Sequence, residues 1–206
     1  MRPVRQFPTL SFPPSSTRLT DFPSRLFKAG TRLFRIVRKG RGPWWFGSAM
    51  DGRFDLLEPH GTCYLAADPL AAFLEIFGPE RAGGFVSSEF LLERRLRELQ
   101  IPEDVRAADM TFRQASRFGI TAEIGTIVPY ERPQAWAHCL HEADFQGIVY
   151  WLRHDPAQSE GVALFGPHGE RKSWKRGGNG RSPANWLPGS TPNVASRSFP
   201  SRASRI

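Results

Sequence analysis

The middle of the chain alternates between short apolar runs with the two-residue period of strands and short runs with the period of helices. The segments with a strand pattern are 31–38, 62–67, 105–110, 147–152 and 161–166. The segments with a helical pattern are 69–77, 87–99, 111–117 and 133–143, with a strand as the alternative at the start of 87–99. This mixture predicts one α+β domain, in which helices flank a curved and mostly antiparallel sheet.

The helix at 69–77 has the clearest beginning of these elements. Asp68 is a good N-cap and Pro69 suits the first helical position, so the helix is expected to begin there. At 100° per residue its larger apolar side chains share one face, which is expected to pack on the core. These side chains are Leu70, Phe73, Leu74 and Phe77.

Glu75 lies on a different face of the same helix, beside Ala71 and Ala72. One interpretation is a solvated charge on the outer face of the helix. The other is a binding carboxylate, because small neighbours leave room for a ligand to approach it. The helix alone leaves both interpretations open.

The two ends of the chain differ in composition from the middle. Residues 1–29 are rich in Pro and Ser without periodicity and are predicted to form a flexible arm. Residues 169–206 contain eight Lys or Arg and one Glu, and are predicted to form a basic, disordered tail. The domain is therefore expected to span 30–168. It has more acidic than basic residues, so direct binding of nucleic acid is not expected.

The composition also indicates the class of protein. No apolar run reaches the roughly 18 residues of a membrane span, and the first residues lack the apolar core of a secretory signal. Two cysteines in 206 residues give no disulfide framework, which favours a cytoplasmic location. His138, Cys139 and His141 lack a second ligand cluster, so no metal site is predicted.

Two arginines and a tyrosine are further candidates for a binding site. Arg35 lies in a strand between apolar neighbours, and Arg53 follows a loop in the segment DGRFD. Each either binds an anionic ligand or forms a structural salt bridge, with Asp55 and Asp68 as possible partners. Tyr64 is either a packed aromatic residue or a ligand contact.

Several segments together resemble the RES domain over about residues 31–166. They are LFRI, GRFD, GTCYLAADPLAAFLE, QAWAHCL and GIVYWLRHDPAQSEGVALFG. The most specific feature is the spacing of eleven residues from Arg53 to Tyr64 and again from Tyr64 to Glu75. The arginine of the first strand in the family pattern falls on Arg35.

The resemblance implies a fold related to that of ADP-ribosyltransferases, with a cleft that binds NAD. The family comprises bacterial toxins that degrade NAD and are paired with Xre-type helix-turn-helix antitoxins. The implied reaction cleaves the nicotinamide–ribose bond of NAD by water or inorganic phosphate, without a cofactor. By the same resemblance, Glu75, Arg53 and Arg35 would be catalytic, and Tyr64 would bind NAD together with the two arginines.

The sequence departs from the family pattern at one position. Leu152 stands in YWLRHDP where the family has a serine, and a leucine side chain forms no hydrogen bond. Two alternatives to the NAD-degrading toxin remain, and the first of them is motivated by Leu152. One is a catalytically degenerate domain that binds nucleotide or antitoxin, and the other is an enzyme that transfers ADP-ribose to a protein.

Overall fold

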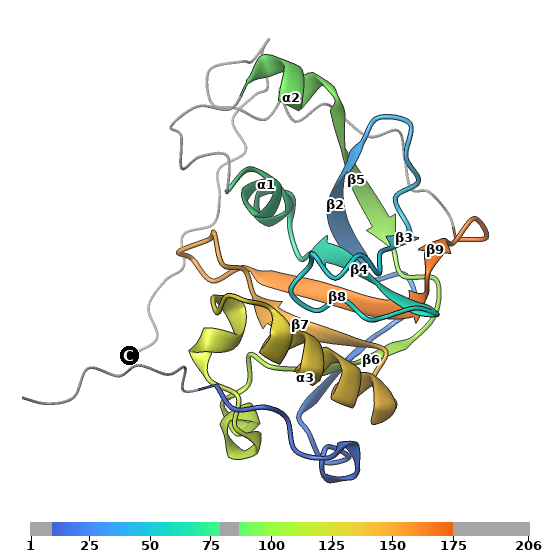
Figure 1. Ribbon diagram of the computed structural model, residues 1–206. Coiled ribbons are helices and arrows are strands. Elements are labelled where there is room, and N and C mark those ends of the chain that lie inside the picture. The colour runs from blue at the N-terminus through green and yellow to red at the C-terminus, as the bar shows by residue number, and fades with distance from the viewer. Residues whose placement is uncertain (1–9, 79–86, 175–206) are drawn as a thin grey trace, which may run out of the picture.

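The structure is a computed structural model that describes residues 10–78 and 87–174 (Figure 1). Its α-helices are α1 (Pro69–Phe77), α2 (Ser88–Leu92) and α3 (Glu131–Glu142). The 3-10 helices are η1 (Ser16–Arg18), η3 (Arg113–Phe118) and η4 (Ala122–Gly125). The strands are β1 (Ser24–Phe27), β2 (Arg32–Arg38), β3 (Trp45–Phe46), β4 (His60–Ala66), β5 (Arg94–Gln100), β6 (Val105–Asp109), β7 (Gly147–Trp151), β8 (Glu160–Pro167) and β9 (Gly169–Glu170).

Seven of these strands form one sheet in the order β1-β6-β7-β8-β4-β2-β5. Neighbouring strands are antiparallel except β6 and β7, which are parallel. The strand direction changes strongly between β8 and β5, so the sheet is curved (Figure 1). The predicted α+β domain with a mostly antiparallel sheet is confirmed.

The sheet is weakest between β2 and β4. These two strands pair at a single position, Phe34 with Ala66. By contrast, β2 pairs with β5 along its whole length, from Arg32 opposite Gln100 to Arg38 opposite Arg94. The two halves of the sheet therefore separate beside β2, and α1 packs over both β2 and β4 at this place (Figure 1).

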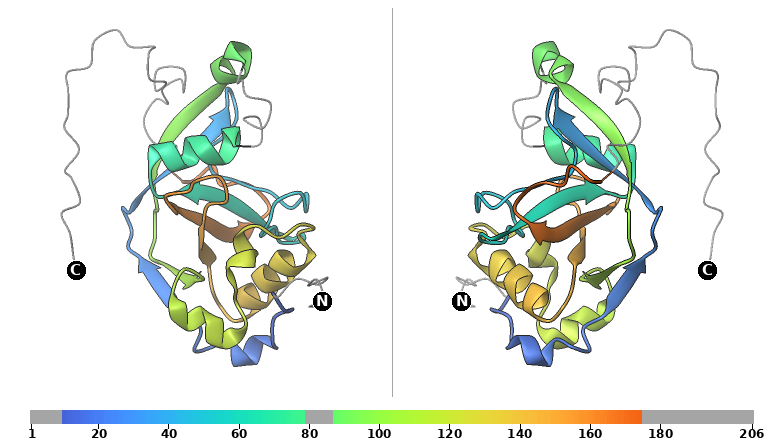
Figure 2. Two further views of the ribbon diagram at one scale, coloured as in Figure 1. Left: turned by 90° about the vertical axis from the view of Figure 1, so that its left-hand side faces the viewer. Right: turned by 90° about the vertical axis from the view of Figure 1, so that its right-hand side faces the viewer.

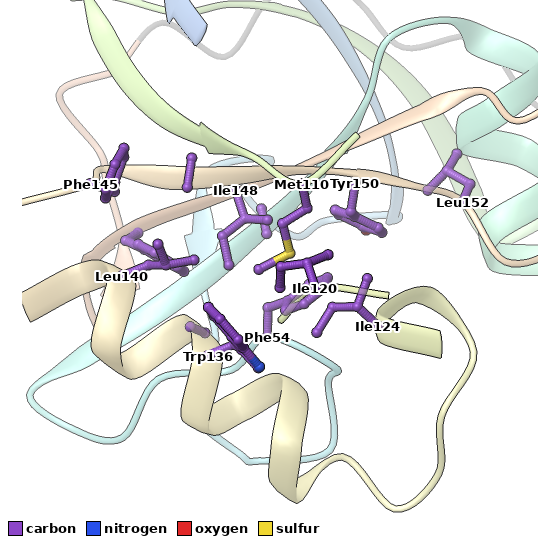
Figure 3. Packing of buried hydrophobic residues seen from close by; sticks show 14 of the residues in the cluster. Phe54, Met110, Ile120, Ile124, Trp136, Leu140, Phe145, Ile148, Tyr150 and Leu152 are labelled. Carbon is purple, nitrogen blue, oxygen red and sulfur yellow. The ribbon is translucent and has the colours of Figure 1, made fainter. Parts of the chain in front are cut away.

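The core occupies both faces of the sheet, because successive strand residues point to opposite sides. On one face, α3 covers the sheet with Trp136 and Leu140, which pack in the same cluster as Phe54, Phe145 and Ile148 (Figure 3). On the other face a smaller cluster contains Leu33, Trp44, Phe46, Cys63, Leu65, Val162 and Leu164. The views from either side show α3 and the 3-10 helices on the same side of the sheet (Figure 2).

Residues 10–29 are part of the folded domain, which corrects the prediction of a flexible arm for 1–29. Leu10, Leu19 and Phe22 are almost fully buried, and β1 pairs with β6. The prolines and serines between these anchors conceal the pattern, because no single run is periodic. Residues 1–9 of the predicted arm lie outside the described residues.

The domain also continues past residue 168, where the sequence placed the start of the tail. Strand β9 pairs with β3. Trp174 packs edge-on against Trp44 and Phe46, with ring centroids 4.9 and 5.9 Å apart. These contacts add Trp174 to the smaller core cluster. Residues 175–206 of the predicted tail lie outside the described residues.

The prediction of one helix over 87–99 is wrong for most of that segment. Helix α2 ends at Leu92, and Arg94–Gln100 forms β5 along the edge of the sheet. The Leu, Glu and Arg residues of this segment are good helix formers. Pairing with the full length of β2 overrides that preference, as tertiary contacts often do. The predicted helix at 111–117 is the 3-10 helix η3.

Helix α1 has the predicted bounds, and the Asp68 side chain accepts a hydrogen bond from the Ala71 N–H at 2.8 Å. The predicted core face is wrong in part, because Leu70 is 58% exposed, whereas Phe77 is fully buried and Phe73 packs against the core. The buried residues are Ala71, Ala72 and Phe77. Small side chains on the inner face let the helix backbone lie close to the sheet. As a result, Glu75 faces partly inward.

Phe22 offers a test that residues 10–29 stabilise the domain. The centroid of its ring lies 5.0 Å from the ring centroid of Phe118 and 6.2 Å from those of Trp136 and Phe145. We expect Phe22→Ala to lower the free energy of unfolding by about 3–5 kcal/mol, measured by urea denaturation. The control Phe12→Ala removes a ring that is 50% exposed, and a loss below about 1 kcal/mol is expected. Equal small losses would contradict the assignment of this segment to the core.

Candidate functional site

A cavity of about 360 Å³ lies where β2 and β4 separate. Its walls come from β2, the loop at 51–53, β4, α1, Tyr130, Tyr150 and residues 152–154. This volume is within the range of small-molecule sites. Three of the four residues that the sequence singled out for binding or catalysis contribute side chains near one another here. They are Arg53, Tyr64 and Glu75.

Glu75 is the acidic centre of the cavity. Its Oε2 atom is buried and has no hydrogen-bond partner among the described residues. Burial raises the pKa of the Glu75 carboxyl, while the positive charges of Arg53 and Arg153 act in the opposite direction. A buried carboxylate oxygen without a partner is costly unless a ligand satisfies it. The interpretation of Glu75 as a binding carboxylate is therefore favoured over a solvated surface charge.

Arg53 is held rigidly at the edge of the cavity. Its Nη1 donates to the carbonyl oxygen of Ile127 at 2.8 Å. Its guanidinium also lies over the ring of Tyr130, 4.7 Å from the centroid. Burial lowers the pKa of Arg53, but an arginine stays protonated under physiological conditions. The cavity therefore contains a fixed positive charge near Glu75.

Tyr64 holds the loop that carries Arg53. Its hydroxyl accepts a hydrogen bond from the N–H of Phe54 at 2.7 Å and donates one to Asp55 Oδ1 at 2.8 Å. Asp55 in turn accepts from the N–H of Gly52 at 2.9 Å. Burial raises the pKa of Tyr64 well above its ordinary value. The hydroxyl thus has a clear positioning role, since both of its bonds go to the loop.

Arg35 borders the cavity, but its guanidinium is directed elsewhere. Nη1 lies 2.7 Å from the carbonyl oxygen of Pro43, 3.0 Å from that of Trp45 and 2.9 Å from Cys63 Sγ. Strand alternation puts Arg35 on the sheet face opposite to Phe34, which lines the cavity. The structure therefore does not bring the Arg35 guanidinium together with Arg53 and Glu75.

The structural salt bridges left open by the sequence are not formed by these two arginines. The ion pairs of the described residues include none between Arg35 or Arg53 and Asp55 or Asp68. Asp68 caps α1, and Asp55 is hydrogen-bonded within the loop. This leaves the Arg53 charge available for an anionic ligand.

The sequence analysis did not single out several polar or aromatic residues of the cavity, among them Asp51, Tyr130, Tyr150, Arg153 and His154. Tyr150 is buried beside Phe54, with ring centroids 4.8 Å apart. Burial lowers the pKa of His154, and the nearby charges of Arg153 and Arg53 lower it further. A side chain at Gly78 would collide with the His154 ring, so this glycine lets His154 lie against the end of α1. Arg153 and His154 could have been recognised as candidate site residues from the sequence, because they directly follow Leu152, where the family pattern has a serine.

Leu152 lies in the wall of the cavity and is 4% exposed. It packs in the same core cluster as Tyr150 and Ile124 (Figure 3). The position where the family pattern has a serine therefore presents an apolar surface to the cavity. A ligand can therefore contact the Leu152 side chain only by van der Waals contacts.

The fold and the cavity define an α+β domain whose cleft is lined by two carboxylates, Asp51 and Glu75, and by the arginines Arg53 and Arg153. The sequence profile of the RES domain matches residues 32–179, and the chain therefore belongs to the RES domain family. This confirms the resemblance seen in the sequence motifs.

A solved structure shares the fold. A chain in the crystal structure of the M. tuberculosis MbcT–MbcA toxin–antitoxin complex matches with a TM-score of 0.56 and 18% identity. The match covers 76% of this chain and 84% of that chain. A comparison with curated proteins found no match.

Two structural observations concern other kinds of site. In residues 10–78 and 87–174, no group of three or more His, Cys, Asp or Glu side chains is arranged to hold a metal ion. Among the same residues, no helix combines the length and the apolar character needed to cross a bilayer.

Proposed function

We propose that this protein is the toxin of a toxin–antitoxin system and that it cleaves the nicotinamide–ribose bond of NAD. The observation that carries the proposal is the buried Glu75 oxygen, which has no protein partner among the described residues and lies in a cavity with Arg53. Membership of the RES domain family and the likeness to a chain of a toxin–antitoxin complex support it.

Arg53 would bind the pyrophosphate of NAD. A guanidinium offers several donors in a fixed plane and suits phosphate oxygens. Because Ile127 and Tyr130 already hold this side chain, the phosphate would meet a charge that is in place before binding. The dinucleotide would then be oriented with its nicotinamide ribose toward Glu75.

Glu75 would stabilise the transition state. As the bond between C1 of the ribose and the nicotinamide nitrogen breaks, the electron pair leaves with nicotinamide and positive charge develops on the ribose. A carboxylate that is already fixed in the cavity stabilises this charge. Water or inorganic phosphate then forms the new bond to C1, and water gives up a proton in doing so.

The partner we propose is an antitoxin of the Xre helix-turn-helix type, and the proposed location is the cytoplasm, where NAD is available. The Arg35 guanidinium points away from Glu75 and donates to the carbonyl oxygens of Pro43 and Trp45. Arg35 would therefore contribute to the reaction only indirectly, by holding the loop at 43–45 against β2. Tyr64 would act through the loop that carries Arg53.

The direct experiment measures NAD loss and nicotinamide release by purified protein, with and without inorganic phosphate. We expect equal amounts of NAD lost and nicotinamide formed. Radiolabelled NAD follows the ADP-ribose: label in solution supports water or phosphate as the acceptor. Label on a macromolecule would instead support protein ADP-ribosylation, and absence of NAD loss would contradict the proposal.

Leu152→Ser tests the departure from the family pattern. A serine in this wall can form one hydrogen bond to the ribose, worth about 0.5–1.5 kcal/mol, so NAD turnover is expected to rise about 2-fold to 10-fold. The control Leu152→Ala removes the same packing without adding a hydroxyl. A wild-type protein that leaves NAD intact, together with an active Leu152→Ser variant, would favour a degenerate RES domain.

A further inference from the structure

A second cavity, of about 520 Å³, adjoins the one that contains Glu75. The two cavities share three residues of their walls: Tyr150, Leu152 and Arg153. The other walls of the second cavity come from η3, η4 and the loop between them, and from single residues that flank these helices or lie in and after β7. These single residues are Met110, Phe112, Thr126, Trp151, Asp155, Pro156 and Gln158. The two cavities therefore have a common boundary, and they are called the first lobe (with Glu75) and the second lobe below.

The second lobe has the surface of a site for a flat, apolar group. Met110, Ile120 and Ile124 line it and belong to the core cluster beneath (Figure 3). Phe112 and Trp151 also line it and remain 44% and 38% exposed. Aromatic and aliphatic side chains left uncovered around a hollow are typical of a ligand site.

The second lobe also contains an unsatisfied polar group. Thr121 lines it, and the Oγ1 atom of Thr121 is buried without a hydrogen-bond partner among the described residues. A buried hydroxyl without a partner is costly, and a ligand with a hydrogen-bonding edge removes that cost. An apolar wall with one hydroxyl recognises a heteroaromatic base better than it recognises a pure hydrocarbon.

The boundary between the lobes carries positive charge. Arg153 is exposed there, and the described residues give its guanidinium no hydrogen bond or ion pair. Arg53 lies in the first lobe and Arg113 borders the second. The one carboxylate at the second lobe is Asp155, which accepts hydrogen bonds from the N–H groups of Ala157 and Ser159 at 2.9 and 3.3 Å. An anionic group is therefore favoured at the boundary.

We propose that the second lobe binds the purine nucleoside end of a dinucleotide, and that Arg153 binds the pyrophosphate between the two lobes. The assignment of the other end to the first lobe rests on the function proposed above. Arg153 and Arg53 would then bind the phosphates from two sides, and Phe112 and Trp151 would contact the base.

The test uses ADP as the probe, because ADP carries the purine and the phosphates without the nicotinamide end. Ala122 lines the second lobe and is exposed, so Ala122→Trp fills the lobe from the surface. Ala157 is exposed in the loop that contains Asp155, Pro156 and Gln158, but it lines neither lobe itself, so Ala157→Trp is the matched control. We expect calorimetry to show at least 10-fold weaker ADP binding for Ala122→Trp and for Arg153→Met, and unchanged binding for Ala157→Trp.

A second probe separates the two lobes. Nicotinamide mononucleotide lacks the purine, so its affinity is expected to stay within 2-fold in Ala122→Trp. Should Ala122→Trp fail to fold by circular dichroism, Ser116→Trp obstructs the same lobe from η3. Unchanged ADP binding in the folded variants, or the same loss in Ala157→Trp, would overturn the proposal.

The experiment also distinguishes this proposal from the function it rests on. If the wild type cleaves NAD and Ala122→Trp still binds ADP normally, the proposed NAD cleavage is supported and the nucleoside site in the second lobe is wrong. If the wild type leaves NAD intact but ADP binding is lost in Ala122→Trp and Arg153→Met, the nucleotide site is supported and the proposed NAD cleavage is wrong. Wild-type protein that does not bind ADP would overturn the nucleoside site itself.

Discussion

Glu75→Gln is expected to lower NAD turnover by about two to three orders of magnitude, with a much smaller effect on KM. Glutamine keeps the shape of the side chain but loses the negative charge that would stabilise the developing ribose cation. Removal of one fixed electrostatic group from an active site costs a factor of about 10²–10³ in kcat. The measurement is the initial rate of nicotinamide release at saturating NAD.

A matched control is available on the surface of the domain. Glu103 is exposed in the turn between β5 and β6 and lies outside both cavities. Glu103→Gln makes the same chemical change there, and its turnover is expected to equal that of the wild type. If Glu75→Gln retained wild-type turnover, the assignment of Glu75 would be wrong and the cavity would need another catalytic group.

The pH profile of the wild type gives an independent reading of the same carboxylate. Burial raises the pKa of Glu75, and the ionised form is the one that stabilises a cation. Turnover is therefore expected to fall as pH decreases through this raised pKa, so the acidic limb lies above the pKa of an ordinary glutamate. In Glu75→Gln the residual rate should lack that limb.

Arg53→Met is expected to lower kcat/KM for NAD by about 10-fold to 100-fold. Hydrogen bonds to charged groups contribute about 1.5–3 kcal/mol, and Met has a similar length without charge or donors. Most of the loss should appear in KM if Arg53 binds the pyrophosphate in the ground state and the transition state alike. Steady-state kinetics with NAD separates the two parameters.

Arg41→Met is the control for this change, because Arg41 is exposed and lines neither cavity. Arg53→Lys gives a further comparison, since lysine keeps the charge but not the planar set of donors. A partial loss in Arg53→Lys is expected. Wild-type kinetics in Arg53→Met would show that the phosphates of NAD bind elsewhere.

Much of the sheet could be predicted from the sequence because its central strands have strong local patterns. The apolar runs at 147–152 and 161–166 form β7 and β8, and the capped segment after Asp68 forms α1 with the predicted bounds. The segment 94–100 could not be predicted in this way. Its residues favour helix, and only the distant β2 makes it a strand.

The candidate site shows a similar division. The spacing of Arg53, Tyr64 and Glu75 pointed to residues that line one cavity, because a family pattern records three-dimensional proximity that local periodicity does not. The orientation of Arg35 required the structure, since a strand sequence does not say which face meets the cavity. The inner face of α1 was predicted only in part, because Ala71 and Ala72 are buried beside Phe77 while Leu70 is exposed.

The hydrogen bonds of the Tyr64 hydroxyl and of Arg53 have a consequence for affinity. An arginine on a mobile loop would lose rotamer freedom when a phosphate binds, at a cost of about 0.5–1.5 kcal/mol for one side chain. Here the loop is closed by Phe54, Asp55 and Tyr64, and the guanidinium is fixed by Ile127. The rotamer entropy of Arg53 is therefore already lost when the chain folds, not when a ligand binds. The binding free energy of a ligand with a phosphate is correspondingly more favourable.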